Sequence, residues 1–211
     1  MKYELNNYYN EDCLQAMKTF PDNYFDLAIV DPPYGLGNKV VNSGGRFEKY
    51  KTANGNWDNK TPNKNYFKEL MRVSKNQIIW GGNYFELPPT RGFAIWDKKR
   101  PKGFSLASCE FAWTSFDSIA KTFYHLPNQE KNRFHPTQKP VDLYEWLLNN
   151  YATAGDKILD THVGSASSLI ACYNLGFDFI GFELDEEYYQ KSKERLEARM
   201  NQMDLFHMEE S

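Results

Sequence analysis

Four residues with types and spacing suited to chemistry, Asp31-Pro32-Pro33-Tyr34, follow an apolar run directly. That run, residues 25–30, is rich in β-branched side chains, which is typical of a buried parallel strand. Proline cannot extend a strand because it lacks an N–H donor and fixes φ. We therefore expect Asp31 and Tyr34 at the carboxyl end of a strand, where open α/β sheets build their sites.

This tetrapeptide suits attack by an aromatic exocyclic amine, whose lone pair is delocalised into its ring. Asp31 could accept one N–H of the amine and the Pro32 carbonyl the other, and the proline pair would hold that carbonyl rigidly. Tyr34 could stack on an extruded base. The same four residues also fit an ordinary turn after a strand, so the rest of the chain has to decide.

A second candidate site lies between a predicted strand that ends at Asp160 and a predicted helix that begins at Ser167. The small residues there would let backbone N–H groups approach a ligand. Glu183, at the end of the next strand, is placed to accept from the two hydroxyls of a ribose. A lone Gly164 makes no dinucleotide fingerprint, and Asp160 would repel pyrophosphate but pair with an ammonium group. S-adenosylmethionine fits both carboxylates, and a plain strand-to-helix turn is the alternative.

The elements that position these residues alternate between strand-like and helix-like segments, which predicts a doubly wound α/β sheet. The pattern predicts helices over residues 12–20, 63–74, 141–151, 167–175 and 185–201, and strands over residues 25–30, 77–80, 92–96, 157–160 and 177–183. Residues 108–116 and 120–126 are interpreted as two further strands that form a hairpin near the sheet edge.

The composition is that of one compact enzyme domain, with 211 residues of which 41% are hydrophobic and 16% aromatic. Because the sequence has neither a membrane-length apolar stretch nor a signal-peptide core, we expect a cytoplasmic protein. The three cysteines lie far apart and the four histidines show no ligand spacing, so we expect neither a disulfide framework nor a metal site.

Charge is unevenly distributed although the net charge is only −3. Residues 41–103 carry 13 basic and 5 acidic side chains, whereas residues 183–211 carry 4 and 9. A basic middle can hold a phosphate backbone. The candidate DNA contacts are Arg46, Lys49, Lys51, Lys98, Lys99, Arg100 and Lys102. Four of these lie in a basic loop at about residues 97–103. An ordinary solvated loop without DNA contacts explains this basic cluster about as well.

A long segment at about residues 35–64 is rich in Gly, Asn and Lys and has almost no periodicity. Loops of this length in a compact domain usually bind something, cover a site or are disordered. Because the segment follows the first candidate site directly, we interpret it as a target-recognition or lid loop that closes over DNA and a flipped base. Disorder without function is the alternative.

Taken together, the motifs resemble those of the amino-methylating (N6-adenine/N4-cytosine) DNA methyltransferases. They are Asp31-Pro32-Pro33-Tyr34, His135-Pro136-Thr137-Gln138-Lys139-Pro140, Leu159-Asp160 with Gly164-Ser165, and Gly181-Phe182-Glu183. Their order, with the catalytic motif before the cofactor motif, resembles the permuted group of that family. The resemblance covers nearly the whole chain, from Tyr9 to about Leu196.

The resemblance implies a single-domain, Rossmann-like fold that binds S-adenosylmethionine, over about residues 1–200. It also implies a seven-stranded mixed sheet flanked by helices, with one antiparallel edge strand. The implied catalytic residues are Asp31, Pro32, Pro33 and Tyr34. The implied cofactor-binding residues are Asp12 at the adenine, Glu183 at the ribose, and Asp31, Thr137, Gln138, Lys139, Asp160, Gly164 and Ser165.

Two positions depart from the family pattern in the cofactor loop. Ala166 stands where a glycine is usual, and His162 where a phenylalanine is usual. Three hypotheses follow: an adenine-N6 methyltransferase, a cytosine-N4 enzyme of the same architecture, or a catalytically weakened relative that binds DNA or cofactor. The D-P-P-Y motif favours adenine. Such an enzyme either belongs to a restriction–modification pair or acts alone.

The predicted C-terminal tail, residues 201–211, contains a second resemblance. Gln202-Met203-Asp204-Leu205-Phe206 resembles the pentapeptide by which bacterial replication and repair proteins dock on the DNA sliding clamp. Leu205 and Phe206 would be apolar anchors, and Gln202 would make directional hydrogen bonds. Alternatively, these side chains pack on the enzyme's own helices or on a second subunit. We expect a monomer or a homodimer.

Overall fold

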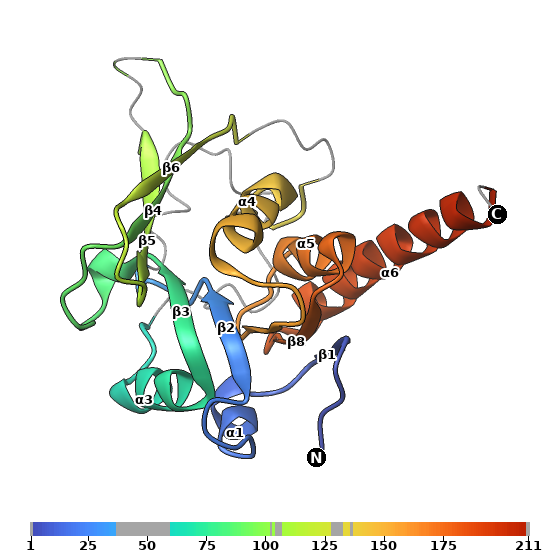
Figure 1. Ribbon diagram of the computed structural model, residues 1–211, viewed down its shortest axis with the longest axis horizontal. Coiled ribbons are helices and arrows are strands. Elements are labelled where there is room, and N and C mark those ends of the chain that lie inside the picture. Colours follow the sequence, from blue (N-terminus) through green and yellow to red (C-terminus); the bar gives the residue numbers. More distant parts are fainter. Residues whose placement is uncertain are drawn as a thin grey trace.

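A computed structural model describes residues 2–36, 60–101, 103, 107–127, 133–135 and 137–209, with side chains only as far as Gln202. The described residues form one eight-stranded sheet flanked by helices (Figure 1). The strands are β1 (Asn7–Tyr9), β2 (Phe25–Val30), β3 (Ser74–Trp80), β4 (Phe93–Asp97), β5 (Cys109–Thr114), β6 (Lys121–Tyr124), β7 (Lys157–Asp160) and β8 (Asp178–Phe182). The helices are α1 (Cys13–Met17), α3 (Lys64–Val73), α4 (Val141–Tyr151), α5 (Ser167–Leu175) and α6 (Glu186–Glu209), with a 3₁₀ turn η2 (Gly82–Tyr84).

The strand order is β1-β8-β7-β2-β3-β5-β4-β6, and all neighbouring strands except β5 run parallel. The predicted number of seven strands is corrected to eight. The additional strand β1 has only three residues, too few to show a pattern in the sequence, and it adds to the free edge of β8 with Tyr9 beside Phe182.

The antiparallel strand is internal rather than at the edge, because β5 pairs with β3 on one side and with β4 on the other. The predicted hairpin of residues 108–116 with residues 120–126 is therefore wrong. Both strands exist, but each side of β5 is already taken, so β6 adds in parallel to the remaining side of β4.

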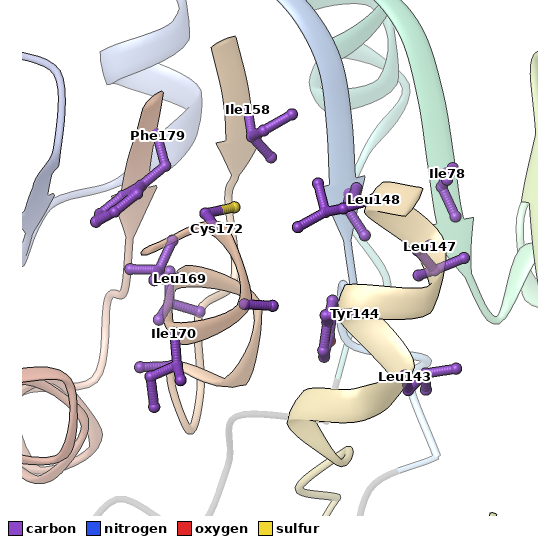
Figure 2. Close-up of a cluster of buried hydrophobic side chains, with 14 of the residues drawn as sticks. Ile78, Leu143, Tyr144, Leu147, Leu148, Ile158, Leu169, Ile170, Cys172 and Phe179 are labelled. Carbon is purple, nitrogen blue, oxygen red and sulfur yellow. The ribbon is translucent and has the colours of Figure 1, made fainter. Parts of the chain in front are cut away.

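Helices cover the two faces of the sheet. The side chains of α4 and α5 turn toward the strands that carry Ile78, Ile158 and Phe179, as Figure 2 shows. On the other face, α1 and α3 pack their buried residues against a second cluster that includes Phe25, Ile79 and Phe182. The predicted bounds of α4 and α5 are confirmed.

The last helix is longer than predicted. Its backbone is helical from Glu186 to Glu209, so residues 201–209 continue α6, whereas the prediction ended the helix at Asn201 (Figure 1). The sequence after Asn201 contains neither glycine nor proline, and its two Met, two Glu and one Leu favour a helix. None of the helices in the described part of the chain has the length and apolar character that crossing a membrane would require.

Arg72, near the end of α3, fastens that helix to the loop after α1. Its guanidinium donates to the backbone carbonyls of Met17 and Phe20, both at 2.9 Å, and forms ion pairs with Asp22 and Glu69. A planar guanidinium can serve all four acceptors at once, whereas a lysine ammonium cannot hold this geometry. Arg72 therefore fixes the position of α1 and α3 beneath β2.

We expect Arg72→Lys to lower the free energy of unfolding by roughly 1–3 kcal/mol, because two carbonyls lose their donors. Urea unfolding followed by circular dichroism measures this change. The matched control is Arg91→Lys, whose partner Asp117 lies 3.4 Å away in a largely exposed pair, so its expected change is below about 0.5 kcal/mol. Equal losses in the two variants would contradict the fastening role.

Candidate functional site

Three carboxylates lie at the carboxyl ends of three neighbouring strands. Asp31 follows β2, Asp160 ends β7, and Glu183 follows β8. These strands are adjacent and parallel, so their carboxyl ends share one edge of the sheet. The expectation that Asp31 and Tyr34 stand where the chain leaves a strand is confirmed, since β2 ends at Val30.

Both oxygens of the Asp31 carboxylate are engaged. The Tyr34 hydroxyl donates to Oδ1 at 2.5 Å, and the Lys139 ammonium forms an ion pair with Oδ2. Burial raises the pKa of Tyr34 well above its usual value, so its phenol stays neutral and remains a donor. Because a carboxylate offers about four lone-pair directions, Asp31 can still accept one further N–H.

The Tyr34 ring is held by two features that the sequence analysis did not identify. Tyr84 of η2 stacks on it, with ring centroids 4.9 Å apart and an interplanar angle of 14°. Gly81 lies against it at φ +66°, and a Cβ at that position would come within 2.2 Å of Tyr34 Cε1. The available signal was the Gly81-Gly82 pair directly after a strand, which indicates a close backbone approach.

Asp160 is 2% exposed, and its carboxylate has only neutral hydrogen-bond donors among the described residues. The Ser168 hydroxyl donates to Oδ2, and the backbone N–H of His162 donates to Oδ1. Burial, together with the charges of Asp31 and Glu183, raises the pKa of Asp160 to about 7. A carboxylate in this state would be stabilised by an arriving cation such as an ammonium group.

Glu183 bridges the turn between β7 and α5. Its carboxylate accepts from the backbone N–H of Gly164 at 2.8 Å and of Asp185 at 3.0 Å, and burial raises its pKa. The Asn10 side chain donates to the Glu183 carbonyl at 2.9 Å, which brings the N-terminal segment to the same place. The backbone donors fix this carboxylate, whose remaining lone pairs can accept from hydroxyl groups.

The two departures from the family pattern have different structural consequences. Ala166 is fully buried at φ 61°, a left-handed conformation that costs an alanine about 1–2 kcal/mol and a glycine almost nothing. His162 retains aromatic packing, because its ring contacts Tyr66 edge-on at 5.4 Å. Burial lowers the pKa of His162 to about 4, so the ring is neutral and substitutes for phenylalanine without adding charge.

The segment that ends at Pro140 lies beside both carboxylate sites. Gln138 and Lys139 are buried, and the Thr137 hydroxyl lies 3.2 Å from His135 Nδ1. The His135 ring lies 3.5 Å from the position that a Cβ on Gly164 would occupy. The Lys139 ammonium contacts Asp31 and Glu110. The cofactor-binding roles of Thr137, Gln138 and Lys139 stay predictions.

Two further predicted cofactor residues serve local structure here. The Asp12 side chain caps α1 by accepting from the backbone N–H groups of Leu14 and Gln15. The buried Ser165 hydroxyl lies 3.1 Å from that of Ser167. Contact of Asp12 with an adenine and of Ser165 with a cofactor stay predictions. Within the described ranges, no group of three or more side chains could hold a metal ion.

One of the candidate DNA contacts is corrected. Lys98 is 8% exposed and forms an ion pair with Glu110, so it is not available to a phosphate backbone. Its place directly before Lys99 and Arg100 made it look like part of a solvated basic run, but it points inward from the end of β4. Lys99 is exposed and Arg100 is half-buried. The other candidates, Arg46, Lys49, Lys51 and Lys102, lie outside the described residues, as does most of the predicted loop at residues 35–64.

Comparison with known proteins shows which family the chain resembles in sequence. The sequence model of the DNA methylase family matches residues 79–194. The type II methyltransferase M.HpaI of Haemophilus parainfluenzae is 28% identical over 92% of this chain and 74% of its own.

Two solved structures share the fold. The M1.HpyAVI–SAM complex has a TM-score of 0.58 and 22% identity over 90% of this chain and 98% of its own. The cytosine-N4-specific PvuII DNA methyltransferase has a TM-score of 0.59 and 15% identity over 92% and 91%. The family match covers more than half of the chain, and the motifs lie together at one edge of the sheet, so this protein belongs to the DNA methylase family.

Proposed function

We propose that this protein transfers the methyl group of S-adenosylmethionine to the exocyclic N6 amine of adenine in DNA, after the base has been flipped out of the duplex. The observation that carries the proposal is the shared sheet edge, where Asp31 is held by two donors beside Asp160 and Glu183. One carboxylate orients an amine there, and two others suit an amino-acid nucleoside.

On the base side, Asp31 and Pro32 act on the amine. An N–H bonded to Asp31 and another to the Pro32 carbonyl would aim the nitrogen lone pair, and both acceptors are fixed before the base arrives. The proton that the amine loses on methylation can pass to Asp31 or to water. Tyr34 and Tyr84 supply an aromatic platform next to this point.

On the cofactor side, S-adenosylmethionine supplies a methyl group activated by a sulfonium. Asp160 would bind the ammonium of its methionine part, because this buried carboxylate has no cationic partner among the described residues. Glu183 would accept from the ribose hydroxyls while the backbone N–H of Gly164 keeps it in place. The same edge would then hold the cofactor and the target base side by side.

The choice of adenine rests on the D-P-P-Y motif. The alternative is the N4 amine of cytosine, whose chemistry at Asp31 and Pro32 would be the same; PvuII DNA methyltransferase, which has this fold, is cytosine-N4-specific. A catalytically weakened relative is the third hypothesis, and the strained Ala166 in the cofactor turn favours it. The preserved Asp160, Gly164 and Glu183 favour an active enzyme.

We also propose how the protein meets its substrate and partners. Because its proposed substrate is DNA, the protein acts in the cytoplasm. Among the described residues, Lys99 and Arg100 remain candidate phosphate contacts. The protein is a monomer or homodimer. Residues Gln202, Leu205 and Phe206 could dock on a sliding clamp; because the backbone of α6 is helical as far as Glu209, an extended peptide would first require the last turns to unwind.

The proposed reaction predicts a specific product. Incubation of unmethylated DNA with the protein and labelled S-adenosylmethionine, followed by nucleoside mass spectrometry, should yield N6-methyladenine. Asp31→Asn should lower the rate at least about a hundredfold, since loss of an oriented polar group typically costs this much. Asp117→Asn, at an exposed position, is the control. Formation of N4-methylcytosine would support the cytosine alternative. Absence of any methylated nucleoside would support the catalytically weakened relative.

Cofactor binding should depend on pH through Asp160. The pKa of about 7 means that its carboxylate gains charge as pH rises from 6.0 to 7.5. Affinity for the ammonium-bearing cofactor should therefore increase on the order of tenfold over this interval. His135 and His162 stay neutral throughout, because burial lowers their pKa values to about 3 and about 4.

Calorimetric titration of the wild type and of Asp160→Asn at several pH values measures this effect. The variant should bind the cofactor weakly and with little pH dependence. An equal pH response in both proteins would place the ammonium elsewhere.

Clamp docking can be measured with the isolated tail. A peptide of residues 201–211 should bind a purified bacterial clamp in the micromolar range, and replacing Leu205 and Phe206 by alanine should abolish the binding. The intact protein with the same two substitutions shows whether the docking uses the full chain. If that variant loses thermal stability while the wild type shows no clamp binding, the tail is a packing element.

A further inference from the structure

Four charged side chains of alternating sign form a chain that ends at Asp31. In order they are Lys98, Glu110, Lys139 and Asp31, and each contacts the next through an ion pair. They come from the end of β4, from β5, from the approach to α4 and from the end of β2. Only the tertiary fold brings them together, and neither Glu110 nor Lys98 has a role in the proposed function.

The chain is largely withdrawn from water. The Lys139 side chain is 2% exposed and that of Lys98 is 10%, whereas those of Asp31 and Glu110 are 17% and 29% exposed. A buried charge without a partner costs several kcal/mol, so each lysine needs its carboxylates. Each ammonium also lies near an indole ring, Lys98 at 4.8 Å from that of Trp96 and Lys139 at 5.1 Å from that of Trp80, which favours the charged form.

Lys139 is shared between two carboxylates. Its ammonium contacts Oδ2 of Asp31 and lies 3.3 Å from Oε2 of Glu110. The other Glu110 oxygen, Oε1, pairs with Lys98. An amine that binds the remaining lone pairs of Asp31 shares this carboxylate with the lysine, and Glu110 offers the same ammonium a second acceptor within reach.

Glu110 and Lys139 are both charged at neutral pH, so the sharing of the ammonium needs no proton transfer. Burial raises the pKa of Glu110, but the charges of Lys139 and Lys98 outweigh it and lower that pKa to about 2. Burial lowers the pKa of Lys139, but Asp31 and Glu110 outweigh it and bring that pKa above its ordinary value.

We propose that Glu110 is a positioning residue for the catalytic carboxylate Asp31. It holds the Lys139 ammonium and pairs with it more strongly as the target amine binds Asp31. This inference rests on the proposed function, because the amine is that of the target base. Glu110 acts only through Lys139. Without it, Lys139 would pair with Asp31 alone and draw this carboxylate away from the amine.

The test compares Glu110→Gln with the wild type in single-turnover methyl transfer at saturating cofactor and DNA. Glu110→Gln keeps the shape of the side chain and removes its charge, so Asp31 loses its position. The transfer rate should then fall roughly tenfold to a hundredfold, which is typical of a displaced catalytic group. Dissociation constants for S-adenosylmethionine and for DNA should stay within about threefold. Glu110→Asp, which restores the charge, should recover part of the rate.

The matched control is Glu69→Gln on α3. Glu69 is also largely buried and forms an ion pair with Arg72, but Arg72 ties α3 to the loop after α1 and not to Asp31. We expect this control to lose thermal stability and to keep its transfer rate. If Glu110→Gln behaves in the same way, or if neither Glu110 variant folds, Glu110 is a structural residue and the proposal is wrong.

A double-mutant cycle tests the route through Lys139. If Glu110 acts only through this lysine, Glu110→Gln combined with Lys139→Met should be no slower than Lys139→Met alone. Additive losses would overturn the proposal. A wild-type protein that transfers no methyl group would overturn the proposed function as well, whereas an active wild type with an unaffected Glu110→Gln would overturn this inference alone. Transfer to cytosine instead of adenine would leave the inference intact.

Discussion

The convergence of three carboxylates at one edge of the sheet is the constraint on which the rest of the site depends. Like charges brought out of water repel one another and disfavour ionisation, so each needs its own stabilisation. The protein solves this in three ways. Asp31 receives a buried ammonium and Glu183 receives two backbone N–H groups. Among the described residues Asp160 receives only neutral donors, and its pKa is raised to about 7. The least stabilised carboxylate is the one that the proposed function assigns to a cation.

The scaffold around these charges is rigid where a small displacement would matter most. Gly81 lies at the Tyr34 ring where no side chain would fit, and the ring is further held by Tyr84 and by its hydrogen bond to Asp31. Positions fixed in this way keep the Asp31 carboxylate oriented, which is the condition that the proposed function sets for catalysis by preorganised polar groups. Ala166 shows the opposite case, in which the fold tolerates backbone strain in the turn between β7 and α5.

The charge chain connects this site to the half of the sheet that follows β3. Because β5 lies between β3 and β4, its residue Glu110 can reach both Lys98 and Lys139. The internal antiparallel strand is thus more than a topological detail. It carries the Glu110 carboxylate into the sheet. On an edge strand, water on one side would screen the ion pairs of this carboxylate.

The sequence by itself determined the elements around the motifs and the motifs' place at strand ends. The apolar run before Asp31, the helix at residues 141–151 and the strand before Asp160 are local patterns, because periodicity and proline or glycine signals act within one segment. It also predicted that Asp31, Asp160 and Glu183 each stand at the end of a strand, where open α/β sheets build their sites.

Only the tertiary structure decided what depends on pairing between distant segments. The three residues of β1 are too few to show periodicity, and the place of β5 between β3 and β4 follows from which strand sides remained free. Lys98 belongs to a basic run in the sequence, yet its direction at the end of β4 makes it a buried ion-pair partner. The contact of Lys139 with Asp31 joins residues that are 108 positions apart. No local pattern encodes such a contact, because it exists only when the packed sheet and α4 bring the two charges out of water together.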